Sequence, residues 1–173
     1  MSKLKSKIIK NFLNCHNIQD ITTVLNESYV PLNEEDKQSI QIENGLEVDD
    51  TIKTIIHKFM DFLKEQLELD QLPKIHLLLN RKEGMTFGSY EPSSNTVLAY
   101  AKNRKLADIL RTAAHEIVHH WQNKEGKIPE QLNGRNKELE SEANTKAGDF
   151  IYMFGLKEPD VYEIDITPEN VIS

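Results

Sequence analysis

Apolar residues recur with the spacing of helices in three segments of the chain. The first segment follows Asp49 or Asp50, either of which can cap a helix, and two more extend over about 105–123 and 136–154. Gly155 stands directly after the third segment, at the position where a glycine commonly ends a helix. The pattern therefore predicts three helices, the last of them ending at Gly155.

Short segments between these helices have the pattern of β-strands. KIHLLLN (74–80) is a nearly continuous apolar run, which is typical of a buried strand. MTFGSYEP (85–92) and TVLAYA (96–101) are separated only by SSN, which predicts a hairpin. We therefore predict an α+β fold with a small, mixed and mostly antiparallel sheet of three or four strands, packed with helices.

Residues 1–48 have a weaker pattern, in which apolar pairs such as Ile8 and Ile9 are separated by asparagine, aspartate and glutamate. We expect short helices there, in an N-terminal extension that packs on a domain formed by residues 49–173. A chain of 173 residues suffices for one domain with a core and is short for two. We therefore predict a single-domain protein.

The composition narrows the class of function. The net charge of −7 disfavours binding to nucleic acid or to an anionic membrane. The apolar runs are much shorter than a bilayer-spanning segment. Cys15 is the single cysteine, so the chain cannot form an internal disulfide, which fits a reducing compartment. We expect a cytoplasmic protein and a monomer.

Residues 115–119 have the sequence HEIVH, in which His115, Glu116 and His119 match the metal-binding pattern HExxH. The chain's own usage of histidine and glutamate gives only about 0.02 accidental matches. Helix positions four residues apart lie about 40° apart around the axis, so both imidazoles project over one spot. Zinc binds neutral imidazole nitrogens, and a catalytic site keeps one position open for water that a carboxylate can deprotonate. The pattern predicts one Zn²⁺ per chain, held by the two histidines, with Glu116 as the general base.

The rest of this predicted helix supports that orientation, because an apolar face lies opposite the two histidines. We expect that face, Leu106, Leu110, Ala113, Ile117 and Trp121, to pack against the core. The polar side, on which we expect a cleft, carries Asp108, Thr112 and Gln122 beside the histidines. His120 points elsewhere, because neighbouring helix residues do not share a face. Two histidines on a solvated helix face remain the alternative interpretation.

A third ligand is predicted on the following helix. Glu140 shares its face with small and apolar residues, whereas Glu138 and Glu142 lie on the opposite side. A carboxylate on an inward face is costly unless a metal or a partner satisfies it. We therefore predict Glu140 as the third metal ligand. Asn144, one turn later, is placed to hydrogen-bond a ligand and orient it.

Two further interpretations concern the charges of this helix. Glu142 and Lys146 have the spacing of an ordinary exposed ion pair. The alternative to a metal ligand at Glu140 is a half-buried acid paired with Arg111 or Arg135.

Taken together, HEIVH and ELESEAN resemble the gluzincin arrangement, HExxH on one helix and ExxxD or ExxxN on the next. The ESEAN form is similar to the small ImmA/IrrE-type metallopeptidases. The segments GSYEPSSNTVLAYAKNR, ADILRTAAHEIVHHWQN and ESEANTKAGDF also resemble small metallopeptidase-like proteins of large tailed bacteriophages. This resemblance covers about residues 74–156 and implies a zincin-like domain in the host cytoplasm, with association with the virion as a further option.

The resemblance implies a zinc metallopeptidase that hydrolyses peptide bonds with a zinc-activated water and Glu116 as base. It also implies an edge strand along which a peptide or protein substrate lies. The residues of that strand are Thr96, Val97, Leu98, Ala99 and Tyr100. The candidate donors to an oxyanion are Tyr90, Tyr100, Tyr152 and Tyr162.

Other functions remain open. One is a binding or regulatory module, inactive or with a structural zinc, that captures a partner peptide along the sheet edge. Another is a different metallohydrolase such as peptide deformylase, which we disfavour because Cys15 is not in an upstream strand of the required kind. A thiolate from Cys15 folding back onto the zinc would hold a peptidase latent. His16, His57 and His76 have no ligand-type partner in the pattern, and we interpret them as structural or solvent-facing.

Overall fold

Four short strands form the main sheet of the computed structural model, which describes residues 39–127 and 136–169. The strands are β1 (Ile40–Ile42), β2 (Lys74–Leu78), β3 (Gly88–Glu91) and β4 (Thr96–Tyr100). Their order across the sheet is β1-β2-β4-β3. Strands β1, β2 and β4 are parallel, and β3 is antiparallel to β4. The predicted α+β class with a mixed sheet is confirmed.

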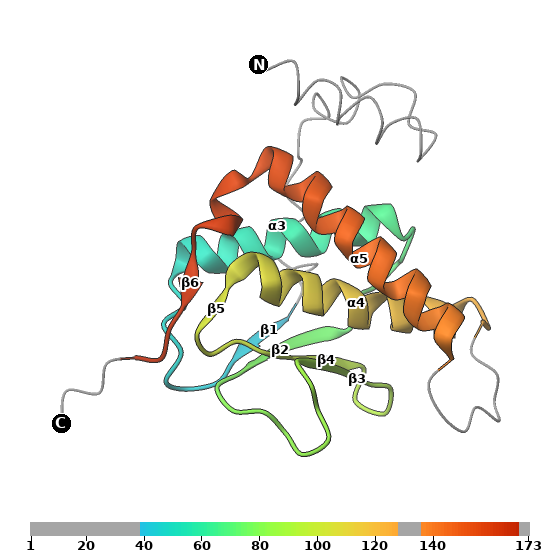
Figure 1. The fold of residues 1–173 in the computed structure, drawn as a ribbon, viewed down its shortest axis with the longest axis horizontal. Helices are drawn as coiled ribbons and strands as arrows, with labels where there is room; N and C mark the ends of the chain where they lie inside the picture. Colours follow the sequence, from blue (N-terminus) through green and yellow to red (C-terminus); the bar gives the residue numbers. More distant parts are fainter. Residues whose placement is uncertain (1–38, 128–135, 170–173) are drawn as a thin grey trace. The chain divides into compact units, whose positions relative to one another are not determined.

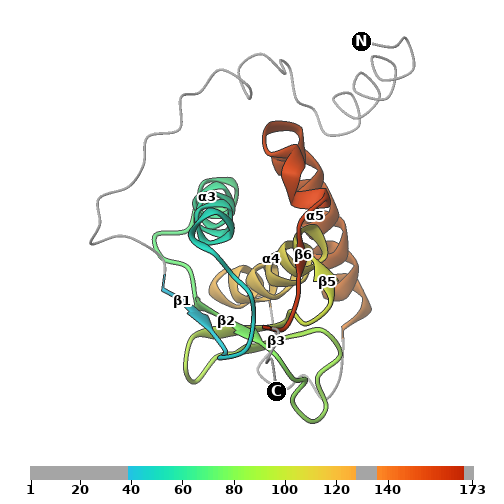
Figure 2. The same ribbon diagram turned by 90° about the vertical axis from the view of Figure 1, so that its left-hand side faces the viewer.

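Three α-helices lie on one side of this sheet in the described part of the chain (Figure 1). They are α3 (Asp50–Gln66), α4 (Leu106–Lys124) and α5 (Lys137–Lys157). Helix α4 contacts strands β3 and β4 below it and helices α3 and α5 above it (Figure 2). The central helix of the fold is therefore the one that carries HEIVH.

The predominantly antiparallel pairing that we predicted is wrong for this sheet, since two of its three pairings are parallel. For β1 and β2 the reason is the crossover between them. The side chain of Asp49 accepts a hydrogen bond from the Ile52 N–H and caps α3, which returns the chain to the start of the sheet. The second strand therefore runs parallel to the first.

The hairpin is confirmed, but its outer strand is β3 and not β4. Strand β4 lies between β2 and β3, and four of its five residues are buried. The prediction that Thr96, Val97, Leu98, Ala99 and Tyr100 form an edge strand is therefore wrong. The continuous apolar pattern of TVLAYA is that of a strand with neighbours on both sides.

The core lies between the sheet and the helices, and it confirms most of the apolar face predicted for α4. Leu106, Leu110, Ala113 and Ile117 are all buried. Trp121 is only partly buried, and the ammonium of Lys127 lies 4.0 Å from its ring centroid. Packing of this face against the core fixes the rotation of α4 about its axis. The same packing therefore fixes the direction of the opposite face, which carries the two histidines.

The end of α5 differs from the prediction. The helix continues through Gly155 to Lys157, and a 3₁₀ turn η2 (Pro159–Tyr162) follows. A Cβ on Gly155 would lie 2.4 Å from Cε2 of Tyr162, so glycine here allows the tyrosine ring to approach the helix. Two further short strands, β5 (Arg104–Lys105) and β6 (Asp165–Ile166), pair antiparallel.

Several predictions fall outside the described residues. Residues 1–38, for which we expected short helices that pack on the domain, are not among the described residues, and neither are Cys15, His16 and Arg135. Residues 40–42, where a helix was also expected, form strand β1 instead. All described residues belong to one compact unit, residues 36–173. Among them, no helix is long and apolar enough to span a membrane.

Candidate metal centre

The helices α4 and α5 bring His115, His119 and Glu140 together. The Nε2 atoms of the two histidines are 3.0 Å apart. Glu140 places one carboxylate oxygen 3.5 Å from His115 Nε2 and the other 3.6 Å from His119 Nε2. All three side chains are partly buried, and one ligand atom from each lies within 4.8 Å of the others. The three predicted ligands are therefore assembled at one point between two helices.

These spacings fit a small tetrahedral metal ion. Zinc bonds to nitrogen and carboxylate oxygen are about 2.0–2.2 Å long, which gives ligand-to-ligand distances of about 3.3–3.5 Å in a tetrahedron. The separations of 3.0, 3.5 and 3.6 Å are close to those edges. Two imidazoles and one carboxylate are also a donor set that catalytic zinc uses, with a fourth position left open.

A buried glutamine orients His119. Nδ1 of His119 donates a hydrogen bond of 2.8 Å to Oε1 of Gln122. An imidazole that is protonated on Nδ1 has its lone pair on Nε2, and that atom faces His115 and Glu140. The contact thus selects the tautomer that a metal ligand requires.

Gln122 is held in turn by α5. It is fully buried, and its Nε2 donates to the Leu139 carbonyl and to Glu142 Oε2, each at 3.0 Å. The prediction that Gln122 faces a cleft is wrong, because this helix position is covered by α5. The exposed Glu142–Lys146 pair that we predicted is not observed among the described residues. Glu142 is partly buried, accepts from Gln122 and forms an ion pair of 3.1 Å with Lys127, whereas the Lys146 ammonium lies 4.9 Å from the Trp121 ring centroid.

The electrostatics of Glu142 match this role. Burial alone would raise the pKa of Glu142, but hydrogen bonds from Gln122 and Lys127 outweigh it and hold the pKa below its usual value. The carboxylate is therefore ionised near neutral pH, where it accepts the hydrogen bond from the glutamine amide.

His115 is held in its neutral form. Burial lowers its pKa, and the neighbouring His119 and Arg111 act in the same direction, against Glu140 and a hydrogen bond with the Asn144 side chain. That hydrogen bond matches the contact predicted for Asn144. Arg111 forms no ion pair with Glu140 in the described part of the chain, so the alternative Glu140–Arg111 pairing is not observed.

Glu116 lies against the first residue of strand β3. A Cβ on Gly88 would be 2.9 Å from Glu116 Oε1 and 2.6 Å from Thr112 Cγ2. The absence of a side chain at position 88 thus leaves the space that Glu116 and Thr112 occupy. The position had a sequence signal, because a glycine inside a strand often marks a close approach of another group.

A cleft of about 970 Å³ runs past these groups. Its walls include the two histidines, Glu116, Glu140 and the residues of β3. Asp108 and Thr112 line it as predicted, and Asn144 lies on the opposite wall. Of the four tyrosines considered as oxyanion donors, Tyr90 is the one on its lining; Tyr162 instead donates to the Ile151 carbonyl.

His120 faces away from the three ligand atoms, as expected. It is 5% exposed, and its Nδ1 lies 2.8 Å from the Tyr90 hydroxyl. The contact joins α4 to strand β3 at the end opposite Gly88. His120 therefore helps to position the sheet edge beside the helix.

The sequence and structure of this chain were compared with those of known proteins. No family model matches the chain, and no curated protein matches its sequence. A solved structure that is similar is the crystal structure of Wss1 from Saccharomyces cerevisiae, with 12% sequence identity and a TM-score of 0.48. The match covers 76% of this chain and 98% of that chain.

Proposed function

We propose that this protein is a zinc-dependent peptidase of the gluzincin type. The observation that carries the proposal is the convergence of His115, His119 and Glu140 at tetrahedral spacings, beside a cleft that also contains Glu116. A metal site that only stabilises a fold is normally closed by four protein ligands. Three ligands on the wall of a cleft are the arrangement of a site that binds substrate.

The chain's own residues have distinct roles in this proposal. His115, His119 and Glu140 would hold the ion, and Gln122 keeps His119 in the required tautomer. Bound zinc would polarise a peptide carbonyl and make water more acidic. Glu116 is the carboxylate that takes a proton from water and returns it to the leaving amine. Its place against Gly88 puts this base between the ligand-bearing helix and the sheet edge.

The edge strand β3 is where an extended peptide would bind. The Tyr100 N–H donates to the Phe87 carbonyl, so the antiparallel alternation directs the backbone groups of Gly88 and Tyr90 away from β4. Within the part of the chain that the structure describes, no strand pairs with that open edge. A peptide that adds to β3 would pass along the cleft and in front of α4.

The test is cleavage of a mixed peptide library by the zinc-loaded full chain and by Glu116→Gln, read by mass spectrometry. We expect cleavage by the native chain only, with equal zinc content in both proteins. Equal cleavage by Glu116→Gln would show that Glu116 is not the base. Bound zinc with no cleavage of any peptide or protein would instead favour a binding module that captures a peptide along β3.

A further inference from the structure

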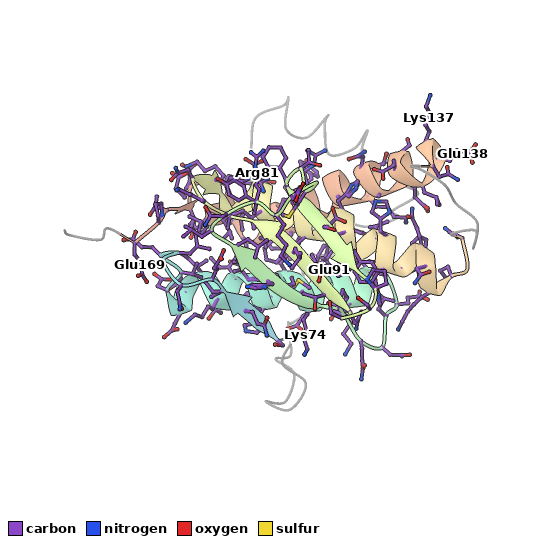
Figure 3. The ribbon with its side chains drawn as sticks, turned by 90° about the horizontal axis from the view of Figure 1, so that it is seen from below. Lys74, Arg81, Glu91, Lys137, Glu138 and Glu169 are labelled. Atoms are coloured by element: carbon purple, nitrogen blue, oxygen red, sulfur yellow. The ribbon has the colours of Figure 1, made fainter. Side chains whose placement is uncertain are left out.

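One end of the cleft carries two arginines around an aromatic ring. The Cζ atoms of Arg81 and Arg104 lie 4.5 and 4.7 Å from the ring centroid of Phe87, which is 43% exposed. Phe87 and Arg104 line the cleft. Figure 3 shows Arg81 at the end of the sheet opposite Lys74 and Glu91. The cluster is therefore built from the loop that follows β2 and from strand β5, which directly precedes α4.

The Arg104 guanidinium is anchored but not neutralised. It donates to the Tyr100 carbonyl at 2.7 Å, and to the Asp108 carbonyl and the Thr112 hydroxyl at 3.0 Å each. Pairing of β5 with β6 fixes its backbone, with Arg104 opposite Ile166. Three bonds from five N–H groups leave two donors without an acceptor among the described residues. The side chain is thus preorganised and still able to bind a ligand.

Around Phe87 three guanidinium groups outnumber the two carboxylates of the same cleft wall, Glu83 and Asp108. Arg81, Arg104 and the exposed cleft residue Arg111 form no ion pair within the described ranges. Burial lowers the pKa of Arg104. The charge of Asp108 raises this pKa, and the charge of Arg81 lowers it further. Asp108 does not approach Arg104 closely enough to pair with it. An anion bound here would be attracted by several guanidinium groups.

The cluster also lies close to the proposed base along α4. Arg104 bonds Thr112, which precedes Glu116 by one helical turn, about 5.4 Å. One residue of an extended peptide covers about 3.3 Å. A ligand group at Arg104 would therefore lie within about two residues of the bond that is cleaved.

The direction of the peptide follows from two contacts of β3. Its first residue, Gly88, lies against Thr112 and Glu116, whereas Tyr90 bonds His120, further along α4. Strand β3 thus runs in the same direction as α4. A peptide that adds antiparallel to β3, the more common pairing, points its C-terminal part toward Arg104.

We propose that Arg104 and Arg111, with Phe87, form a subsite that binds a carboxylate of the substrate on the C-terminal side of the cleaved bond. The carboxylate belongs either to an aspartate or glutamate side chain or to the free C-terminus of the peptide. The position of the peptide rests on the proposed function, whereas the binding of a carboxylate rests on the arginines alone.

Binding is measured first, on zinc-loaded Glu116→Gln so that no peptide is consumed. The probes are two matched pairs of acetylated peptides. One pair is Ala-Ala-Phe-Ala-Glu-Ala amide and its glutamine counterpart; the other is Ala-Ala-Phe-Ala-Ala with a free or an amidated C-terminus. By calorimetry at low salt we expect about tenfold tighter binding of the charged member in at least one pair. The pair that differs identifies the source of the carboxylate, and equal affinities in both pairs would overturn the proposal.

Variants then locate the effect. Arg111→Gln and Arg104→Gln should each reduce the preference to about twofold or less. Lys82→Gln is the matched control, because Lys82 lines the same cleft but is paired with Glu91 at 3.2 Å. The preference should survive in that control. If Arg104→Gln does not fold, Arg104→Met, which also removes the charge, replaces it. A preference unchanged in Arg111→Gln and in the folded Arg104 variant would overturn the proposal.

Cleavage separates this inference from the proposed function. A library cut by the native chain should show acidic residues or a free C-terminus within two positions after the cut. Cleavage without that preference, together with equal binding of the paired probes, would reject the subsite and leave the peptidase. Charge-dependent binding without cleavage would reject the peptidase and keep the carboxylate subsite.

Discussion

Gly88 and Glu116 lie in contact across the boundary between the sheet edge and the central helix. A Cβ at position 88 would come within 2.9 Å of Glu116 Oε1 and within 3.0 Å of its Cγ. A side chain at position 88 would therefore overlap with the proposed base, so the edge strand can lie beside Glu116 only because this residue is glycine. The same contact fixes how near a peptide on β3 would pass to the carboxylate.

Gly88→Ala should separate the base from its working position. The added methyl group meets Thr112 and Glu116, so Glu116 must move while the zinc ligands stay in place. We expect cleavage to fall about 10–100-fold with zinc content unchanged, because small displacements of catalytic groups have effects of this size. Gly148→Ala is the control, since a Cβ there has no neighbour within 4 Å. Full activity of Gly88→Ala would mean that Glu116 is not held by this contact.

Gln122→Leu should weaken zinc binding without removing a ligand. Leucine fills similar space but cannot accept the hydrogen bond from His119 Nδ1. Loss of such a contact typically lowers metal affinity by about 10–100-fold. Competition with a chromogenic chelator measures the change, and circular dichroism checks that the variant is folded. Glu138→Ala, at an exposed site on α5, serves as the control (Figure 3). Unchanged affinity in Gln122→Leu would show that the tautomer of His119 is set in another way.

The metal-free protein should lose stability as the pH falls below 6.5. Burial lowers the pKa of both His115 and His120 from that value, so the unfolded chain binds more protons in this range than the folded chain. The contribution of these two histidines to the free energy of unfolding is fully present above pH 6.5 and is lost as the pH falls toward their pKa values in the folded protein. Urea unfolding in the presence of a chelator at pH 7.5 and 5.5 measures this. His120→Gln should reduce the difference, and identical midpoints at both pH values would contradict the prediction.

The periodicity of apolar residues predicted those parts of the structure that depend on residues close together in the sequence. The three helices and the hairpin follow from spacing within each segment, and His115 and His119 converge because four residues make about one helical turn. Glu140 was predicted from its helix face alone. The order of the strands depends instead on a crossover through α3 and on strand β1, which lies in a segment of weak pattern. Sequence spacing does not encode such long-range pairing.

The supporting residues were missed for a related reason. Gln122 has the helical phase of a cleft residue, but α5 covers it and turns it into a buried partner of His119. Gly155 has the position of a helix end, but the ring of Tyr162 packs over it and the helix continues. Both outcomes depend on contacts with another segment. A polar residue three positions after a ligand histidine was the available signal for Gln122.

Metal content separates the proposed ligand set from its alternatives. We expect about one zinc per chain in protein purified without a metal-affinity tag, and loss of that zinc in both His115→Ala and Glu140→Ala. Glu138→Ala, which removes an exposed carboxylate from the same helix, should retain the metal. Inductively coupled plasma mass spectrometry gives the count, and folding of each variant is checked by circular dichroism. Zinc lost in His115→Ala but kept in Glu140→Ala would mean that another group supplies the third ligand. No metal in the native chain, even after zinc is added, would leave the approach of Glu140 to the two histidines as an ordinary contact between partly buried polar groups.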